Sequence, residues 1–150
     1  MGLMIQFLIS LAVAAFSLST FAQSANVQAP RGQEYSEVKI TQIAKTTTQW
    51  DGSPLPPYPS QNPEITILSY EIPVGVKLPM HKHPVINAGV VMQGTLTVNT
   101  KDGKQLILNP GDSIVELVNQ WHYGMNQGPE TVKLMMFYVG EVGVPLAIKE

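Results

Sequence analysis

The stretch that decides the fold is residues 75–94, which read G-V-K-L-P-M-H-K-H-P-V-I-N-A-G-V-V-M-Q-G. His81 and His83 are two positions apart in an extended segment, so both imidazoles are predicted to project from the same side of one strand. The same parity places Asn87 on that face. The third histidine of the chain is His122. Three imidazoles bind a divalent transition metal well and leave coordination positions for water or substrate. Spacing alone is also compatible with packed, hydrogen-bonded histidines.

Short β-rich segments with turn signals between them surround this stretch. The predicted strands cover residues 37–43, 64–72, 85–93, 95–100, 105–109, 113–118 and 131–139. Residues 51–63 contain five prolines and are predicted to form an extended loop. No long amphipathic helix is evident. Strands at this spacing are typical of an all-β sandwich or barrel, and 150 residues suit a single domain.

Composition excludes several classes of function. The formal net charge is −2, which argues against a polybasic nucleic-acid binder, so no nucleic-acid partner is expected. The chain contains no cysteine. Disulfides, thiol nucleophiles and cysteine-based zinc sites are therefore excluded.

The first 22 residues carry no charged side chain and are predicted to be a signal peptide. The apolar run at residues 3–18 is short for a membrane span, and Thr20 and Ala22 fit the −3 and −1 positions of a cleavage site. An uncleaved N-terminal anchor is the alternative. Cleavage predicts a periplasmic or secreted protein with no stable membrane span.

Two sequence patterns resemble the two motifs of the cupin family. They are Gly75-x5-His81-Lys82-His83-x3-Asn87-x6-Gly94 and Gly111-x5-Leu117-x-Asn119-x2-His122-x3-Asn126. The resemblance implies a cupin-type jelly-roll β-barrel, expected over residues 64–145. Residues 23–63 then form an N-terminal segment with one strand and the Pro-rich loop.

The resemblance also implies a metal site inside the barrel. Carried over by position, His81, His83 and His122 match the family's histidine ligands, whereas Asn87 stands where the family usually has Glu. An amide offers a neutral oxygen and no base. Two alternatives follow: one divalent cation (iron, manganese, zinc or nickel) binds through three His with a weak Asn87 oxygen, or the barrel works without metal.

Glu116 precedes the second motif's Leu117, which replaces the usual Pro, and it is the candidate catalytic residue. It either partners an imidazole N–H and acts as the base that Asn87 cannot be, or it faces solvent on an edge strand.

Two functions remain open from the sequence. The first is a metal-dependent enzyme on a small organic substrate, an anionic one being favoured by a positively charged site, with dioxygenase-like chemistry ahead of lyase or isomerase chemistry. The second is a non-catalytic module that binds or senses a small molecule. Residues 37–43 are expected to add a strand to a partner's sheet, which predicts a homodimer.

Overall fold

The computed structural model describes residues 38–150. Three predicted features lie wholly or partly outside this range. They are the signal peptide, the greater part of the N-terminal segment before the Pro-rich loop, and the first residue of the strand at 37–43. A helix with the length and apolar character needed to cross a membrane does not occur within this range.

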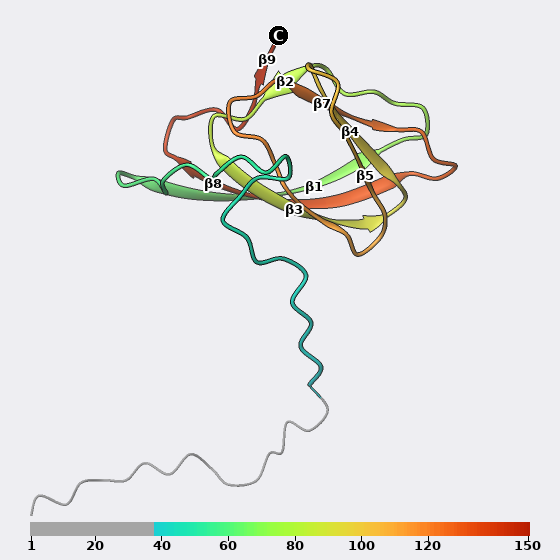
Figure 1. The fold of residues 1–150 in the computed structure, drawn as a ribbon, viewed down its shortest axis with the longest axis horizontal. Helices are drawn as coiled ribbons and strands as arrows, with labels where there is room; N and C mark the ends of the chain where they lie inside the picture. Colours follow the sequence, from blue (N-terminus) through green and yellow to red (C-terminus); the bar gives the residue numbers. More distant parts are fainter. Residues whose placement is uncertain (1–37) are drawn as a thin grey trace, which may run out of the picture. The chain divides into compact units, whose positions relative to one another are not determined.

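The described residues form two antiparallel sheets that face each other (Figure 1). The four-stranded sheet has the order β1 (Pro63–Ile72), β8 (Val132–Glu141), β3 (Ile86–Gln93) and β6 (Ser113–Val115). The five-stranded sheet has the order β5 (Gln105–Leu108), β4 (Leu96–Thr100), β7 (His122–Asn126), β2 (His81–Lys82) and β9 (Ile148–Lys149). Neighbours that are distant in sequence, such as β1 with β8, make this a jelly roll, and the all-β prediction is confirmed.

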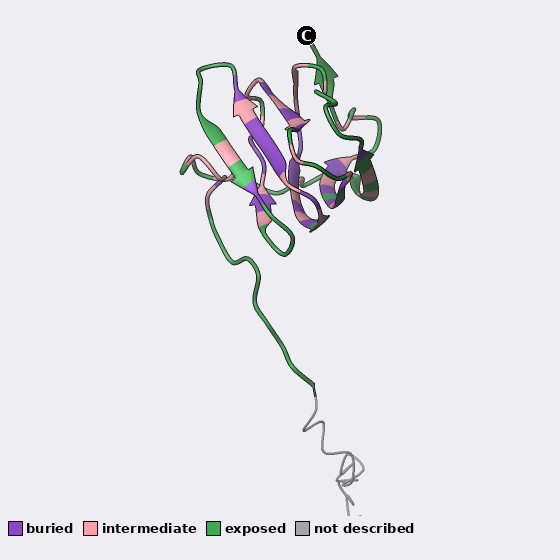
Figure 2. Ribbon diagram, turned by 90° about the vertical axis from the view of Figure 1, so that its right-hand side faces the viewer, coloured by how far each residue is buried: buried purple, intermediate pink, exposed green. Residues whose placement is uncertain are grey.

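The core lies between the two sheets because the strands alternate in polarity. On β8, Leu134, Met136 and Tyr138 are buried, whereas the residues between them point outward. Val91 of β3 and Val98 of β4, each 1% exposed, come from opposite sheets. Figure 2 shows this buried layer within the barrel. Burying one such side chain contributes about 1.5–3 kcal/mol.

Two turns show why the motif residues stand where they do. Gly94 has φ 74°, and a Cβ there would lie 2.9 Å from the Thr131 carbonyl oxygen. Asn119 has φ 60°. Asn is among the few non-glycine residues that adopt the left-handed region readily, so Asn119 makes the turn for which the family usually has Gly.

The strand predicted at residues 37–43 is wrong for its described part. Residues 38–46 have no strand pairing, and Val38 and Ile40 are 61% and 89% exposed. A segment with an alternating pattern forms a strand only where a neighbouring strand pairs with it, and in the described chain these residues have no such neighbour. Strand β9 of the five-stranded sheet lies after residue 145, where the barrel was expected to end.

Candidate metal centre

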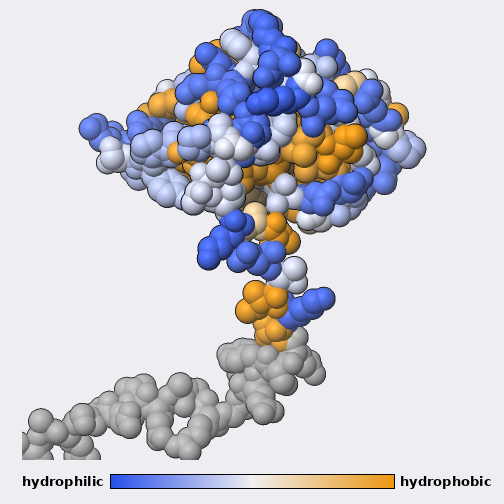
Figure 3. Space-filling model, in the orientation of Figure 1, coloured by the Kyte–Doolittle hydropathy of each residue, from blue (hydrophilic) through white to orange (hydrophobic). Residues whose placement is uncertain are grey.

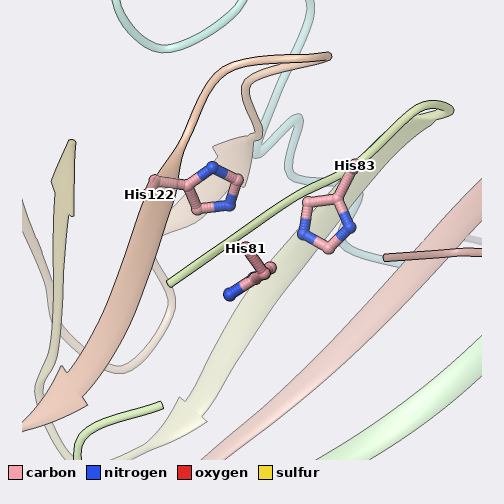
Figure 4. A group of neighbouring side chains, drawn as sticks. All are labelled: His81, His83 and His122. Carbon is pink, nitrogen blue, oxygen red and sulfur yellow. The ribbon is translucent and has the colours of Figure 1, made fainter. Parts of the chain in front are cut away.

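The fold brings His81, His83 and His122 together between the sheets. His81 lies on β2 and pairs with His122 on β7, so these two rings project from the same face of the sheet. Strand β2 ends at Lys82, and His83 follows in an isolated bridge to Val118. The ring centroids lie 4.7–5.2 Å apart, and the nearest ligand atoms all lie within 4.8 Å of one another. Figure 4 shows the three rings grouped around a common point.

Backbone carbonyls fix the tautomer of each ring. The Nδ1 atoms of His81, His83 and His122 lie 2.7, 2.6 and 2.8 Å from the carbonyl oxygens of Pro79, Leu146 and Gln120. A carbonyl oxygen only accepts, so every Nδ1 carries a hydrogen and donates it. The Nε2 atoms of the neutral rings therefore keep their lone pairs, which is how metal-binding histidines are oriented.

Glu116 is buried against these Nε2 atoms, so the solvent-facing alternative is wrong. Its Oε2 lies 2.8 Å from His83 Nε2 and 3.4 Å from His122 Nε2. Atoms about 2.1 Å from one ion are about 3.0 Å apart at a right angle and about 3.4 Å apart at a tetrahedral angle. The spacing of Glu116 from the two imidazoles is thus that of ligands sharing one cation.

The pKa shifts follow from this contact. Burial alone would raise the pKa of the Glu116 carboxyl, but His122 and His83 outweigh it and hold that pKa below its usual value. Burial lowers the pKa of His122, and Glu116 reverses this, so the net direction is upward. The pKa of His81 is lowered, first by burial and then by the two neighbouring imidazoles, against the Pro79 carbonyl and Glu116.

Unpartnered atoms show that the residues fit a cation. His122 is 1% exposed, and among residues 38–150 its Nε2 has no assigned hydrogen-bond partner, although Glu116 Oε2 lies 3.4 Å away. The 2.8 Å contact joins Glu116 to His83 Nε2, and two acceptors approach this closely only with a proton or a metal ion between them. Three histidines in this geometry could hold a metal ion.

Asn87 lies beside this group without a described contact to the three histidines. It is fully buried, and within the described part of the chain its amide nitrogen reaches only the Val85 carbonyl at 3.4 Å and its Oδ1 has no hydrogen-bond partner. Its backbone oxygen accepts a hydrogen bond from the Glu116 N–H at 3.0 Å. The carboxylate of Glu116 therefore belongs to the segment that pairs beside Asn87, one strand across the sheet.

A cavity of about 310 Å³ opens onto the site. His81, His83 and Glu116 line one part of it. Its remaining wall is mostly apolar and includes Leu78, Leu96, Val98, Leu134 and Met136. This volume is at the lower end for ligand sites and suits a small organic molecule.

The sequence analysis missed two tyrosines in this cavity. Tyr70 of β1 and Tyr138 of β8 lie with their hydroxyl oxygens 3.0 Å apart, and the Tyr138 ring centroid is 5.6 Å from that of His83. Burial, followed by Tyr70 and Glu116, raises the pKa of Tyr138, which keeps it protonated. One of the two hydroxyl hydrogens forms the bond between the tyrosines, so the hydrogen of the other hydroxyl remains free to donate to a bound oxygen. Strand parity places each tyrosine inside the barrel, but no sequence signal pairs them.

The comparison with protein families agrees with the fold. Residues 68–138 match the family model described as a cupin domain. Together with the two antiparallel sheets, this match shows that the chain contains a cupin domain.

Solved structures share this fold at low sequence identity. A DMSP lyase, DddQ from Ruegeria pomeroyi, is 15% identical with a TM-score of 0.51, over 57% of this chain and 42% of that one. The polyketide cyclase RemF from Streptomyces resistomycificus is 16% identical with a TM-score of 0.50, over 60% and 62%. A cupin-like protein from Thermotoga maritima is 17% identical with a TM-score of 0.50, over 57% and 64%.

The chain thus spans less than two thirds of the length of each of these proteins. The likeness concerns the fold. The comparison with curated protein sequences gives no match.

Proposed function

We propose that this cupin binds one divalent transition metal and acts on a small organic substrate in the adjoining cavity. His81, His83 and His122 are the histidine ligands. The observation that supports this best is the fixed orientation of all three rings. Every Nδ1 is held by a carbonyl, and the three Nε2 lone pairs are left for a shared cation.

Glu116 completes this donor set and takes the place of the carboxylate that Asn87 lacks. Its charge brings the site to three neutral imidazoles and one carboxylate, a set that suits iron, manganese, zinc or nickel. Asn87 then serves as a neutral neighbour whose unpartnered Oδ1 is available to a bound water.

A divalent ion held here would act as a Lewis acid toward a substrate oxygen. The chain's own residues supply the rest of the environment. The free hydroxyl hydrogen of the Tyr70–Tyr138 pair is placed to donate to a second substrate oxygen. The apolar wall excludes water, which strengthens both interactions. Dioxygenase-like chemistry is the first reaction to test, and a site that binds without turnover is the alternative.

Metal content after overexpression and dialysis tests the site directly. Wild-type protein should retain about one equivalent of metal, measured by mass spectrometry of the digested sample. His83→Ala should lose most of it, because one of three imidazole ligands is gone. The control Gln127→Ala changes an exposed residue of a distant turn and should retain the wild-type amount.

Substitution of Glu116 tests whether its carboxylate supplies the negative charge of the metal site. Glu116→Gln keeps the shape and removes the charge, and should weaken zinc binding by at least about tenfold. Adding Asn87→Glu to Glu116→Gln should recover affinity, since it returns a carboxylate to the family's position. Unchanged zinc affinity in Glu116→Gln would reject Glu116 as a ligand. Oxygen uptake with a panel of small carboxylates and sugars then separates enzyme from binding module.

The homodimer stays a proposal, now supported by exposed apolar residues rather than by a formed strand. Strand β1 is an edge strand, and its outward Ile65 and Ile67 are 64% and 54% exposed beside Phe137 of β8 at 44%. Apolar surface also gathers on the face drawn in Figure 3. Light scattering at high micromolar concentration should give twice the chain mass, and Ile67→Lys should lower it to the monomer value.

Export also stays a proposal and rests on the sequence of residues 1–22. The protein purified from its native compartment should begin at Gln23 or within a few residues of it. Intact-mass analysis checks this. A membrane-bound product that keeps Met1 would overturn the periplasmic or secreted assignment.

A further inference from the structure

Strand β9 places a cation beside the candidate metal centre. Lys149 pairs directly with His81, which in turn pairs with His122. Residues directly opposite on neighbouring antiparallel strands project to the same face. Lys149 therefore points to the same side as the two imidazoles, and it lines the cavity together with Ala147.

The segment that carries Lys149 is held in place by its neighbours on both sides. The Leu146 carbonyl accepts the hydrogen bond from His83 Nδ1, and the Glu150 N–H donates to the Met80 carbonyl at 3.1 Å. Glu150 also forms an ion pair with Lys101. Among residues 38–150, Lys149 makes no ion pair of its own.

The cavity therefore has a charged end and an apolar body. A divalent ion at the histidines, the Glu116 carboxylate and the Lys149 ammonium together leave two positive charges there. This net positive charge favours an anionic ligand. The hydrocarbon walls beyond it favour an apolar chain on the same molecule.

We propose that Lys149 is a specificity residue that binds the carboxylate head of a short-chain organic acid, with the hydrocarbon chain along the apolar wall. This deepens the proposed function by naming its substrate class. The exposed position of Lys149 sets it at the entrance, whereas the buried Tyr138 lies deeper in the cavity.

Calorimetric titration with hexanoate and its neutral analogue hexanamide tests this on zinc-loaded and on chelator-stripped protein. Wild-type protein should bind hexanoate more tightly than hexanamide in both forms. Lys149→Ala should weaken hexanoate binding about tenfold and leave hexanamide binding unchanged, whereas Lys149→Arg should retain the preference. Zinc content of the Lys149 variants should equal that of the wild type.

Lys82→Ala is the matched control. Lys82 pairs with Ile148, one position from the His81 pair, so it points to the opposite face, where its Nζ lies 5.0 Å from the Trp121 ring centroid. The variant removes the same charge and should keep the wild-type hexanoate affinity.

Equal hexanoate affinity in Lys149→Ala and wild type would overturn the proposal. Equal losses for hexanoate and hexanamide would also overturn it, because they would show a structural role only. A Lys149-dependent preference in protein that takes up no zinc would keep the carboxylate site and reject the metal-dependent function. Inorganic phosphate competing as well as hexanoate would overturn the choice of an organic acid.

Discussion

Two buried asparagines, Asn126 and Asn87, differ in how their side chains are satisfied. Both are fully buried. The Asn126 amide donates to the carbonyls of Ile72 and Glu130 at 2.8 Å each, and its Oδ1 accepts from the Gly128 N–H at 3.0 Å. Asn87 makes one long contact and has an unpartnered Oδ1.

The contrast separates the structural part of the barrel from the functional part. Buried polar atoms in folded proteins are normally paired, so each exception needs an explanation. In the described part of the chain, two of the four such side-chain atoms are Asn87 Oδ1 and His122 Nε2. Both residues neighbour Glu116: the Asn87 backbone carbonyl accepts from the Glu116 N–H, and His122 Nε2 lies 3.4 Å from Glu116 Oε2. Buried polar atoms without hydrogen-bond partners at this point indicate where a bound ligand would supply the missing interactions.

The largest effect is expected from Asn126→Ala. It leaves the buried Ile72 carbonyl and the part-buried Glu130 carbonyl and Gly128 N–H without their partner. Each such loss costs about 1–3 kcal/mol. The free energy of unfolding should fall by roughly 3–6 kcal/mol, measured by urea denaturation. Gln127→Ala, on the exposed neighbour, should change it by less than about 0.5 kcal/mol. Similar values for the two variants would contradict the structural role of Asn126.

Zinc addition should stabilise the protein through the site around Asn87 and His122, by less than Asn126→Ala destabilises it. Zinc at 100 times its dissociation constant should raise the free energy of unfolding by about 2.7 kcal/mol, because it binds the folded chain. A chelator should reverse the shift in melting temperature. His122→Gln should respond far less, since it removes the unpartnered Nε2. An equal response in this variant would place the zinc elsewhere.

Asn87→Leu should be nearly neutral in metal-free protein. The substitution removes one long hydrogen bond and one unpartnered oxygen, and it keeps a side chain of similar size. The free energy of unfolding should change by less than about 1 kcal/mol, measured in urea with chelator present. A loss comparable to that of Asn126→Ala would show that Asn87 is structural as well.

The smallest effect on stability is expected at Asp51 in the N-terminal loop, whose carboxylate is hydrogen-bonded as the Asn126 side chain is. Hydrogen bonds from Ser53 first, and then Lys104, overcome the effect of burial and lower its pKa from 3.8 to about 2. A lowered folded-state pKa gives stability that is present above the unfolded value and lost as pH falls from about 4 to about 2. The stability difference between wild type and Asp51→Asn, followed by denaturation across this range, should shrink. A constant difference would contradict this.

Much of the fold was predictable because its signals are local. The alternation in residues 64–72 and 131–139 gave strands that became β1 and β8 with bounds shifted by at most two residues. Parity in the H-x-H pair, together with the second motif, predicted that three histidines meet in one barrel. Residues 38–43 failed because alternation alone cannot supply a pairing partner.

Only the tertiary structure decided what surrounds those histidines. Glu116 follows the last residue of β6, where the chain leaves the ladder and parity no longer says which way a side chain points. Tyr70 meets Tyr138, and Lys149 meets His81, across strands more than 60 residues apart in sequence. Such contacts depend on barrel closure, which the whole core determines, so the sequence could name the candidate ligands but not the groups that surround them.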